Sequence, residues 1–111
     1  MLTVNDDNVM SMTRGEFGEF EVGLENLRTS SKYVMEPEDA LEFSVKKELH
    51  DREYAIHKIV KGTNVFELQP SDTASVSCGR YVYDIRLILA DGKPLAVVDP
   101  ALFELKCGVA K

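Results

Sequence analysis

The sequence predicts an all-β fold, an antiparallel β-sandwich of about seven strands with one short helical turn. Apolar residues recur at every second position along most of the 111-residue chain, which is the spacing of strands that bury one face. Turn-forming residues separate these runs at intervals of roughly 8 to 12 residues, as is typical of sandwiches. No long stretch has apolar residues three and four positions apart, and strands do not alternate with helices, so helical and parallel α/β folds are disfavoured.

The predicted strands are separated by turns or loops. Gly15, in Arg-Gly-Glu, is the expected turn after the first strand. The polar segment 26–39 predicts a long connection between the second and third strands. Strands are expected over residues 9–13, 17–25, 41–46, 56–60, 65–68 and 81–88, followed by a closing strand. The residues expected in the core include Phe20, Val22, Leu24, Leu41, Phe43, Val45, Tyr81, Tyr83, Ile85 and Leu87.

Three local signals refine the C-terminal half. Residues 70–74 (Pro-Ser-Asp-Thr-Ala) predict one helical turn, with Ser71 or Asp72 placed to cap it. Asp91-Gly92 suits a two-residue hairpin turn with positive φ. Pro100 interrupts the closing strand, because proline cannot donate a hydrogen bond to a sheet.

The chain is expected to form a single domain over residues 1–111, with residues 1–8 as a flexible N-terminal arm. The formal net charge is −6, which disfavours nucleic acid and anionic membrane surfaces as partners. The start of the sequence lacks the features of a signal peptide, and no apolar run is long enough to span a membrane. We therefore expect a location in the bacterial cytoplasm or in a particle assembled there.

Cys78 and Cys107 are the only cysteines. The predicted hairpin would bring them to nearly opposite positions, two residues out of register. A bulge of two residues near Pro100 would close that gap. In a cytoplasmic protein such residues are usually free thiols, so we expect proximity without a disulfide bond.

Three segments together resemble a known family. They are Met-Thr-Arg-Gly-Glu at 12–16, Leu-Glu-Phe-Ser-Val-Lys-Lys at 41–47, and the stretch from 68 to 92. That stretch contains the helical turn, a Gly-x-Tyr-x-Tyr-Asp strand and the hairpin. The sequence resembles the Ig-like domains of phage and prophage tail proteins over about residues 9–109, in particular the N-terminal domain of baseplate upper proteins from phages of Gram-positive bacteria.

The resemblance implies an Ig-like β-sandwich that is a structural part of a virion rather than an enzyme. Its partners would be other phage structural proteins, a homo-oligomer is left open, and its location would be the virion or, for a prophage-encoded protein, the bacterial cytoplasm. Receptor binding that belongs to further domains of the larger baseplate proteins is not implied. Tyr81 follows the helical turn, where its hydroxyl group can reach back to the backbone as in a tyrosine corner. Structural roles are expected for Gly15, Tyr81, Tyr83, Asp84, Asp91 and Gly92.

The sequence contains no recognisable catalytic motif. There is no nucleophile elbow, phosphate-binding glycine loop or zinc-protease helix. His50, Asp51 and His57 lack the spacing of a metal-ligand set. We therefore expect no catalytic residue, metal or cofactor, and a non-enzymatic docking module of a phage or prophage tail, neck or baseplate.

Two alternatives remain. The first is a carbohydrate-binding or cell-surface-binding module, which would use loops and exposed aromatic residues. Tyr33 and Tyr54 are the aromatic residues expected near loops, and the chain has no tryptophan. The second is a small enzyme or regulator.

Overall fold

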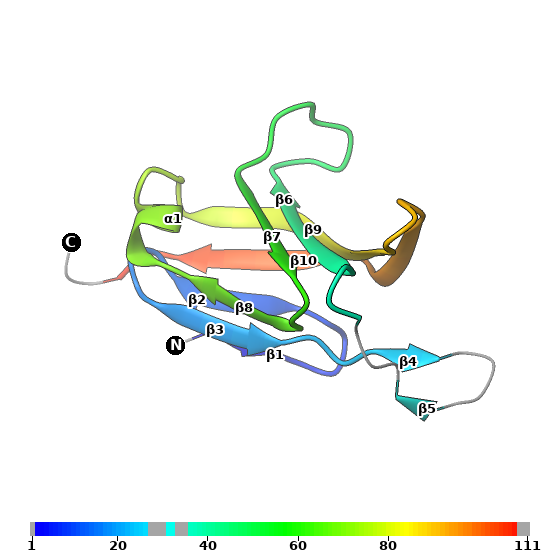
Figure 1. Cartoon of the computed structure of the whole chain (residues 1–111). Helices are drawn as coiled ribbons and strands as arrows, with labels where there is room; N and C mark the ends of the chain where they lie inside the picture. Colours follow the sequence, from blue (N-terminus) through cyan, green and yellow to red (C-terminus); the bar gives the residue numbers. More distant parts are fainter. Residues whose placement is uncertain (1, 27–30, 33–35, 109–111) are drawn as a thin grey trace.

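The computed structural model describes residues 2–26, 31–32 and 36–108, and within those ranges it contains ten strands and one helix (Figure 1). Seven strands have four or more residues, as predicted, and three have two. In chain order they are β1 (Thr3–Val4), β2 (Met10–Thr13), β3 (Gly18–Glu21), β4 (Glu25–Asn26), β5 (Ser31–Lys32), β6 (Ala40–Lys46), β7 (Ile56–Lys61), β8 (Val65–Leu68), α1 (Pro70–Ala74), β9 (Gly79–Ile88) and β10 (Pro94–Lys106).

The strands form two main layers. A six-stranded sheet has the order β1-β2-β10-β9-β6-β7, and β3 and β8 form a two-stranded sheet against it (Figure 1). The placement of β10, β9, β6 and β7 in one layer and of β3 and β8 in the other is that of an Ig-like sandwich. The strand pairs are antiparallel as predicted, except that β2 and β10, the first and last long strands, pair in parallel.

The core is a cluster of aromatic rings around Phe43. Its ring centroid lies 5.2 Å from that of Phe20, 5.7 Å from those of Phe66 and Tyr83, and 6.3 Å from that of Phe103. Rings at these distances and tilted orientations contribute beyond the apolar area that they bury. Except for Leu24, which is partly buried, the residues predicted for the core are buried. The period-two pattern therefore identified the inner faces of β3, β6 and β9 correctly.

Tyr81 forms the contact expected of a tyrosine corner. Its hydroxyl group donates a 2.6 Å hydrogen bond to the carbonyl oxygen of Ser77, four residues upstream. The bond fixes the path of the chain from α1 into β9. Gly79, in between, has φ of +152°, a conformation that side-chain-bearing residues rarely adopt.

The prediction of a flexible arm over residues 1–8 is wrong for the described part. β1 pairs with β2, and the two are joined by a tight turn in which Asn5 N–H donates to the Val9 carbonyl and Asn8 N–H to the Asn5 carbonyl. The Asn5 side chain accepts hydrogen bonds from the amides of Asp7 and Val9. Asn8 has φ of +63°, which asparagine tolerates better than most residues. The asparagines and aspartates that were predicted to form a mobile arm thus form a hairpin turn.

The β9–β10 hairpin also differs from the prediction. Leu89 N–H donates to the Lys93 carbonyl and Gly92 N–H to the Leu89 carbonyl, so the loop has three residues rather than two. Gly92 has φ of +91°, and Asp91 accepts a side-chain hydrogen bond from the Lys93 amide. This is the common combination of a type I turn with a left-handed residue. The same hydrogen-bond pattern closes the Asn5–Val9 turn.

The helical turn α1 is present as predicted, but its cap is different. Gln69 occupies the position before the helix, and Asp72 acts from within the first turn. The Asp72 carboxylate accepts a 2.7 Å hydrogen bond from the Gln69 amide and a 3.0 Å bond from the Lys58 ammonium group of β7. A carboxylate in this position also interacts favourably with the helix dipole.

The segment predicted as a long connection, residues 26–39, includes one strand of a short hairpin. β4 pairs with β5, with Glu25 opposite Lys32. Residues 27–30 and 33–35 lie outside the described ranges, and with them Tyr33. Near the end of the connection, the Asp39 carboxylate accepts a hydrogen bond from the Glu36 amide at 3.0 Å.

Cys78 and Cys107 form a disulfide bond, with their Cα atoms 5.6 Å apart. The prediction that they lie close together is confirmed, and the expectation that they stay unbonded is wrong. The register of β10 against β9 shifts by one residue between Ala96 and Val98 and again between Val98 and Ala101. The last pair of the ladder is Leu105 with Gly79, so Cys107 lies one residue beyond the position opposite Cys78. The compartment assumed from the sequence led to the error, because the local geometry permits the bond.

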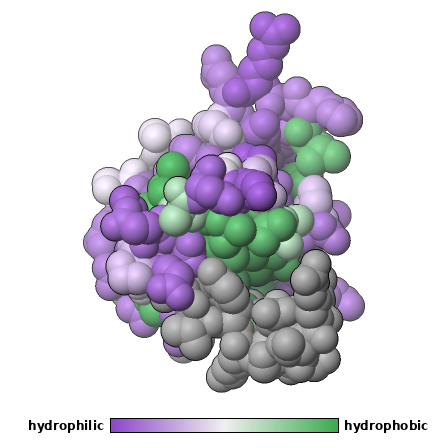
Figure 2. Space-filling model, turned by 45° about the vertical axis from the view of Figure 1, so that its right-hand side comes forward, coloured by the Kyte–Doolittle hydropathy of each residue, from purple (hydrophilic) through white to green (hydrophobic). Residues whose placement is uncertain are grey.

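The two-stranded sheet covers the larger sheet incompletely. An open cavity of about 340 Å³ remains between the layers, lined by Val4, Asn8, Met10, Phe20, Glu21, Val22, Gly23, Tyr83, Ile85, Val97 and Val98. Figure 2, turned from the first view, shows a group of apolar residues at the surface among hydrophilic ones. The core of this small domain thus reaches solvent in places.

Candidate binding site on the outer face of the six-stranded sheet

Two polar residues of β6 are buried on the side of the sheet that faces away from the core. Glu42 and Ser44 are 9% and 7% exposed, although they alternate with the core residues of the same strand. An outward-facing residue of a sheet is normally solvated. Their burial indicates that neighbouring strands and the β6–β7 loop build a structured surface over this face.

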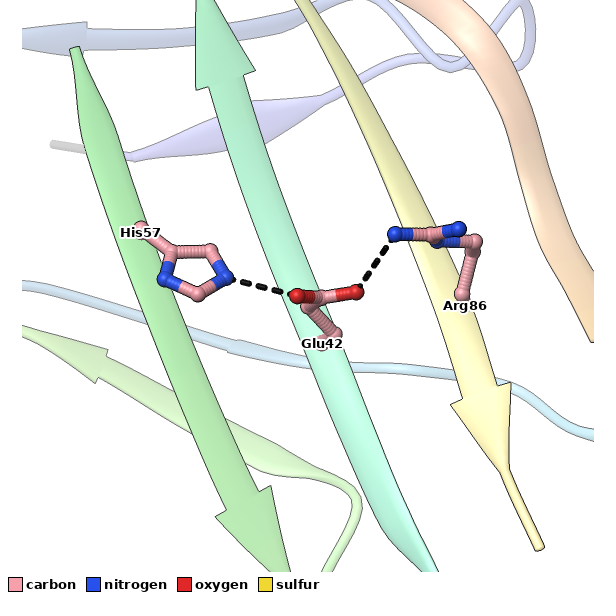
Figure 3. Close-up of polar contacts among 3 residues, drawn as sticks. All are labelled: Glu42, His57 and Arg86. Carbon is pink, nitrogen blue, oxygen red and sulfur yellow. Dashed lines mark hydrogen bonds and ion pairs between the residues drawn. The ribbon is translucent and has the colours of Figure 1, made fainter. Parts of the chain in front are cut away.

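Glu42 lies between two cationic or hydrogen-bonding partners from the adjacent strands (Figure 3). Its Oε1 accepts a 2.8 Å hydrogen bond from Arg86 Nη2 of β9, and its Oε2 lies 2.7 Å from His57 Nε2 of β7. Since an ionised carboxylate only accepts hydrogen bonds, His57 Nε2 carries the proton. The register explains the first contact, because Glu42 and Arg86 are direct cross-strand partners.

The charge state of Glu42 depends on these contacts. Burial acts to raise the pKa of its carboxyl group, but the hydrogen bond from His57 and the Arg86 charge outweigh that effect. The pKa of Glu42 consequently lies below its ordinary value of 4.5. The residue is therefore held as a carboxylate, and the three side chains join β7, β6 and β9 on their outer side.

Tyr54, from the β6–β7 loop, packs on this cluster. Its ring stacks on that of His57, with centroids 4.2 Å apart, and the Lys46 ammonium group lies over it at 5.0 Å. Stacking and cation–π contacts of this kind hold a loop side chain in place. Tyr54 is nevertheless 43% exposed, so part of the ring remains available at the surface.

A pocket of about 70 Å³ opens beside this cluster, lined by Ser44, Lys46, Leu49, Tyr54, Val82, Tyr83, Asp84, Arg86 and Pro100. One wall depends on the irregularity of β10. Val98 pairs with Ile85 and Ala101 with Tyr83, so β10 uses one more residue than β9 over this interval. Bulges of this type commonly redirect a side chain. Here the bulge spans the position of Pro100, which forms part of the pocket wall.

Ser44 and Asp84 meet in this pocket as direct cross-strand partners of β6 and β9. Ser44 Oγ is buried and, among the described residues, has no hydrogen-bond partner. Asp84 is partly buried, and its carboxylate takes part in none of the hydrogen bonds or ion pairs found between described residues. Buried polar groups are otherwise almost always paired. Among the described residues, the floor of the pocket therefore presents a buried hydroxyl group without a partner and a partly exposed carboxylate without an ion pair.

The residue types on this face resemble those of a hydrolase, but the hydrogen bonds differ. Ser44 and His57 are cross-strand partners, and Glu42 binds His57. A nucleophilic serine requires a hydrogen bond to its base, and Ser44 Oγ has none in the described part of the chain. His57 Nε2 donates to Glu42, so Nδ1 is the basic nitrogen, and no hydrogen bond joins it to Ser44 Oγ.

The three residues considered as metal ligands, His50, Asp51 and His57, each have a different environment. His50 is exposed, the Asp51 carboxylate accepts a hydrogen bond from the Glu48 amide, and His57 binds Glu42. Over the ranges that the structure describes, no three His, Cys, Asp or Glu side chains are grouped to hold a metal ion.

The residues singled out from the sequence lie in three places. Asp84 and Tyr83 line the pocket. Tyr81, Asp91 and Gly92 shape the two ends of β9 and its hairpin, as described above. The hydroxyl group of Tyr83 donates a 2.5 Å hydrogen bond to the Asn8 carbonyl, and burial raises its pKa. Gly15 has φ of +83°, and its amide donates to the Thr73 hydroxyl at 2.8 Å.

Sequence reasoning did not identify Glu42 and Ser44. Both occupy the polar positions of an alternating strand, which predicts solvent exposure. Glu42 lies between the side chains of His57 and Arg86 from the neighbouring strands, and Ser44 shares its pocket with Tyr54 and Leu49 of a loop and with Pro100 at the bulge. Neither feature has a signal in the local pattern around β6.

Comparison with known proteins identified no match among protein-family models, curated proteins or solved structures. No helix in the described ranges is long and apolar enough to cross a membrane.

Proposed function

We propose that this domain is a non-enzymatic docking module of a phage or prophage particle, in the tail, neck or baseplate. It binds other structural proteins of the particle through the outer face of its six-stranded sheet. The observation that carries the proposal is the structured polar surface of this face, where Glu42 and Ser44 are buried without facing the core.

The composition of this face supports a protein partner. Exposed large apolar residues surround the polar cluster: Leu49 is 50% exposed, Tyr54 43% and Ile59 57%. Ile59 is the cross-strand partner of Glu42, and Arg86 binds the same glutamate. Tyrosine and arginine, with apolar neighbours, are the residue types that contribute most to protein interfaces.

The assignment to a phage particle is supported by the resemblance of three sequence segments to tail-protein domains. The Cys78–Cys107 disulfide bond fits this assignment. Disulfides persist on virion surfaces and outside cells but are rare in the cytoplasm. We therefore propose that the domain works in the released, extracellular particle, whatever the compartment of its assembly.

Incorporation into particles tests the proposal. Particles purified after induction, analysed by mass spectrometry, should contain the wild-type protein. Leu49→Asp should reduce incorporation at least tenfold, because a desolvated charge at an interface is strongly unfavourable. Leu95→Asp is the matched control, since Leu95 is also 50% exposed but lies in the β9–β10 hairpin. Particles that never contain the wild-type protein, or equal loss for both variants, would refute the proposal.

A carbohydrate-binding or cell-surface-binding module is the second candidate, favoured by the same disulfide bond. The ring of Tyr54 offers little support for it, because His57 and Lys46 both lie against that ring. Sugar binding to a glycan array by the wild-type protein, lost in Tyr54→Ala, would favour this candidate over docking.

A further inference from the structure

We infer that the pocket beside Asp84 receives a basic side chain, a lysine or an arginine, from the protein partner. The inference rests on the proposed docking function and specifies the chemistry of the partner. It starts from two pocket groups: Ser44 Oγ, which is buried without a hydrogen-bond partner among the described residues, and the Asp84 carboxylate, which forms no ion pair with any of them.

These two groups define what is missing from the pocket. A carboxylate accepts hydrogen bonds and carries a negative charge, and a serine hydroxyl group also accepts. The ligand that satisfies both is a cationic hydrogen-bond donor. An ammonium or guanidinium group has several N–H donors, so one head group can bind Asp84 and Ser44 together.

Two cations line the pocket, and each has a contact with a group other than Asp84. Arg86 forms its ion pair with Glu42 at 2.8 Å, and the Lys46 ammonium group lies over the Tyr54 ring. The Arg86 charge is thus balanced within the cluster, whereas neither Asp84 nor Lys46 forms an ion pair with another described residue. The net charge of −6 additionally attracts a basic partner at long range.

The shape of the pocket fits the rest of such a side chain. Leu49, Val82 and Pro100 provide apolar walls, which match the methylene stem of lysine or arginine. The volume of about 70 Å³ exceeds severalfold the roughly 10–15 Å³ that one water needs by the same measure. It accommodates a head group and part of a stem.

An NMR titration of the isotope-labelled protein tests the inference with N-acetyl-lysine amide as the probe. The amide signals of Ser44, Asp84 and Ala101 should shift saturably. N-acetyl-norleucine amide, which has a methylene stem without the charge, and N-acetyl-glutamate amide should not produce these shifts. N-acetyl-arginine amide distinguishes the two basic side chains.

Variants assign the binding to the pocket. Asp84→Asn should weaken probe binding about tenfold or more, the usual effect of losing a charged hydrogen-bond partner. Ser44→Ala should weaken it to a smaller extent and serves as the second variant if Asp84→Asn does not fold. Glu67→Gln removes the same charge from the exposed outer face of β8 and should bind as the wild type does.

The outcomes separate this inference from the proposed function. Three results would overturn the assignment of a basic side chain. They are a lack of saturable shifts with the lysine probe, equal binding of the norleucine probe, and unchanged affinity in both pocket variants. If the wild type enters particles while the lysine probe fails to bind, docking stands and the pocket assignment fails. If the probe binds as expected but the protein never enters particles, the particle assignment fails instead.

Discussion

Replacing both Cys78 and Cys107 with serine removes a bond that ties the start of β9 to the end of β10. The bonded residues are 29 positions apart in the sequence. In the chain-entropy model, a loop of this length restricts the unfolded chain by about 3.6 kcal/mol at 25 °C. The exposed position of Cys107 and the partly exposed one of Cys78 add little packing loss. For a domain of 111 residues, the expected loss corresponds to a fall in Tm of roughly 15 °C.

Urea and thermal unfolding of four samples measure this effect: the wild type and the double variant, each with and without reductant. Reductant should lower the stability of the wild type to that of the double variant and leave the double variant unchanged. Two free thiols in the unreduced native protein, or equal stability of the oxidised and reduced wild type, would refute the reasoning. A single serine substitution is a poorer test, because it leaves a free thiol.

Three further substitutions have distinct expected results. Ser44→Ala should raise the free energy of unfolding by about 1 kcal/mol, because it removes a buried hydroxyl group without a partner, while it weakens binding in the pocket; a loss of stability in urea would contradict this. Glu42→Gln should lower stability at neutral pH. The folded-state pKa of Glu42 lies below 4.5, so the carboxylate stabilises the fold above about that pH, and this stabilisation is lost as the pH falls through the folded-state value. The variant lacks the carboxylate and should therefore lose less stability than the wild type on acidification. Unfolding curves of both proteins between neutral and acid pH check it, and parallel profiles would count against the effect. Tyr81→Phe should cost about 1 kcal/mol, since the Ser77 carbonyl loses its donor; an unchanged urea midpoint would show that the corner contact is dispensable.

The sequence predicted the sandwich well because alternation is a property of each strand by itself. The inner faces of β3, β6 and β9 follow directly from the spacing of residues such as Phe20, Phe43 and Tyr83. The N-terminal hairpin was missed because β1 has two residues, too few for a periodic signal, and because its turn uses Asn8 where glycine is the usual marker. Short-range patterns are weak where an element depends on its neighbour in the sheet.

The candidate site was predictable only in part. Asp84 emerged through the resemblance of its strand to tail-protein domains, without a stated contact. Glu42 and Ser44 could not be found, because the residues around them come from other parts of the chain: His57 and Arg86 contact Glu42, and loop residues and Pro100 share a pocket with Ser44. The proximity of Cys78 and Cys107 was predicted correctly from the hairpin, but a bond between them was not expected because of an assumed compartment, which was the weaker argument.

The parallel pairing of β2 with β10 has a consequence for how the domain forms in time. Met10 of β2 lies opposite Phe103 of β10, so this contact joins residues from the two ends of the sequence. Contacts of such long sequence separation slow folding, because the chain between them must be ordered first. During synthesis, β2 has no partner in the six-stranded sheet except the two residues of β1 until β10 leaves the ribosome. Cys107 follows Lys106, the last residue paired with β2, so closing the sheet and joining the cysteines fall at the same late stage of folding.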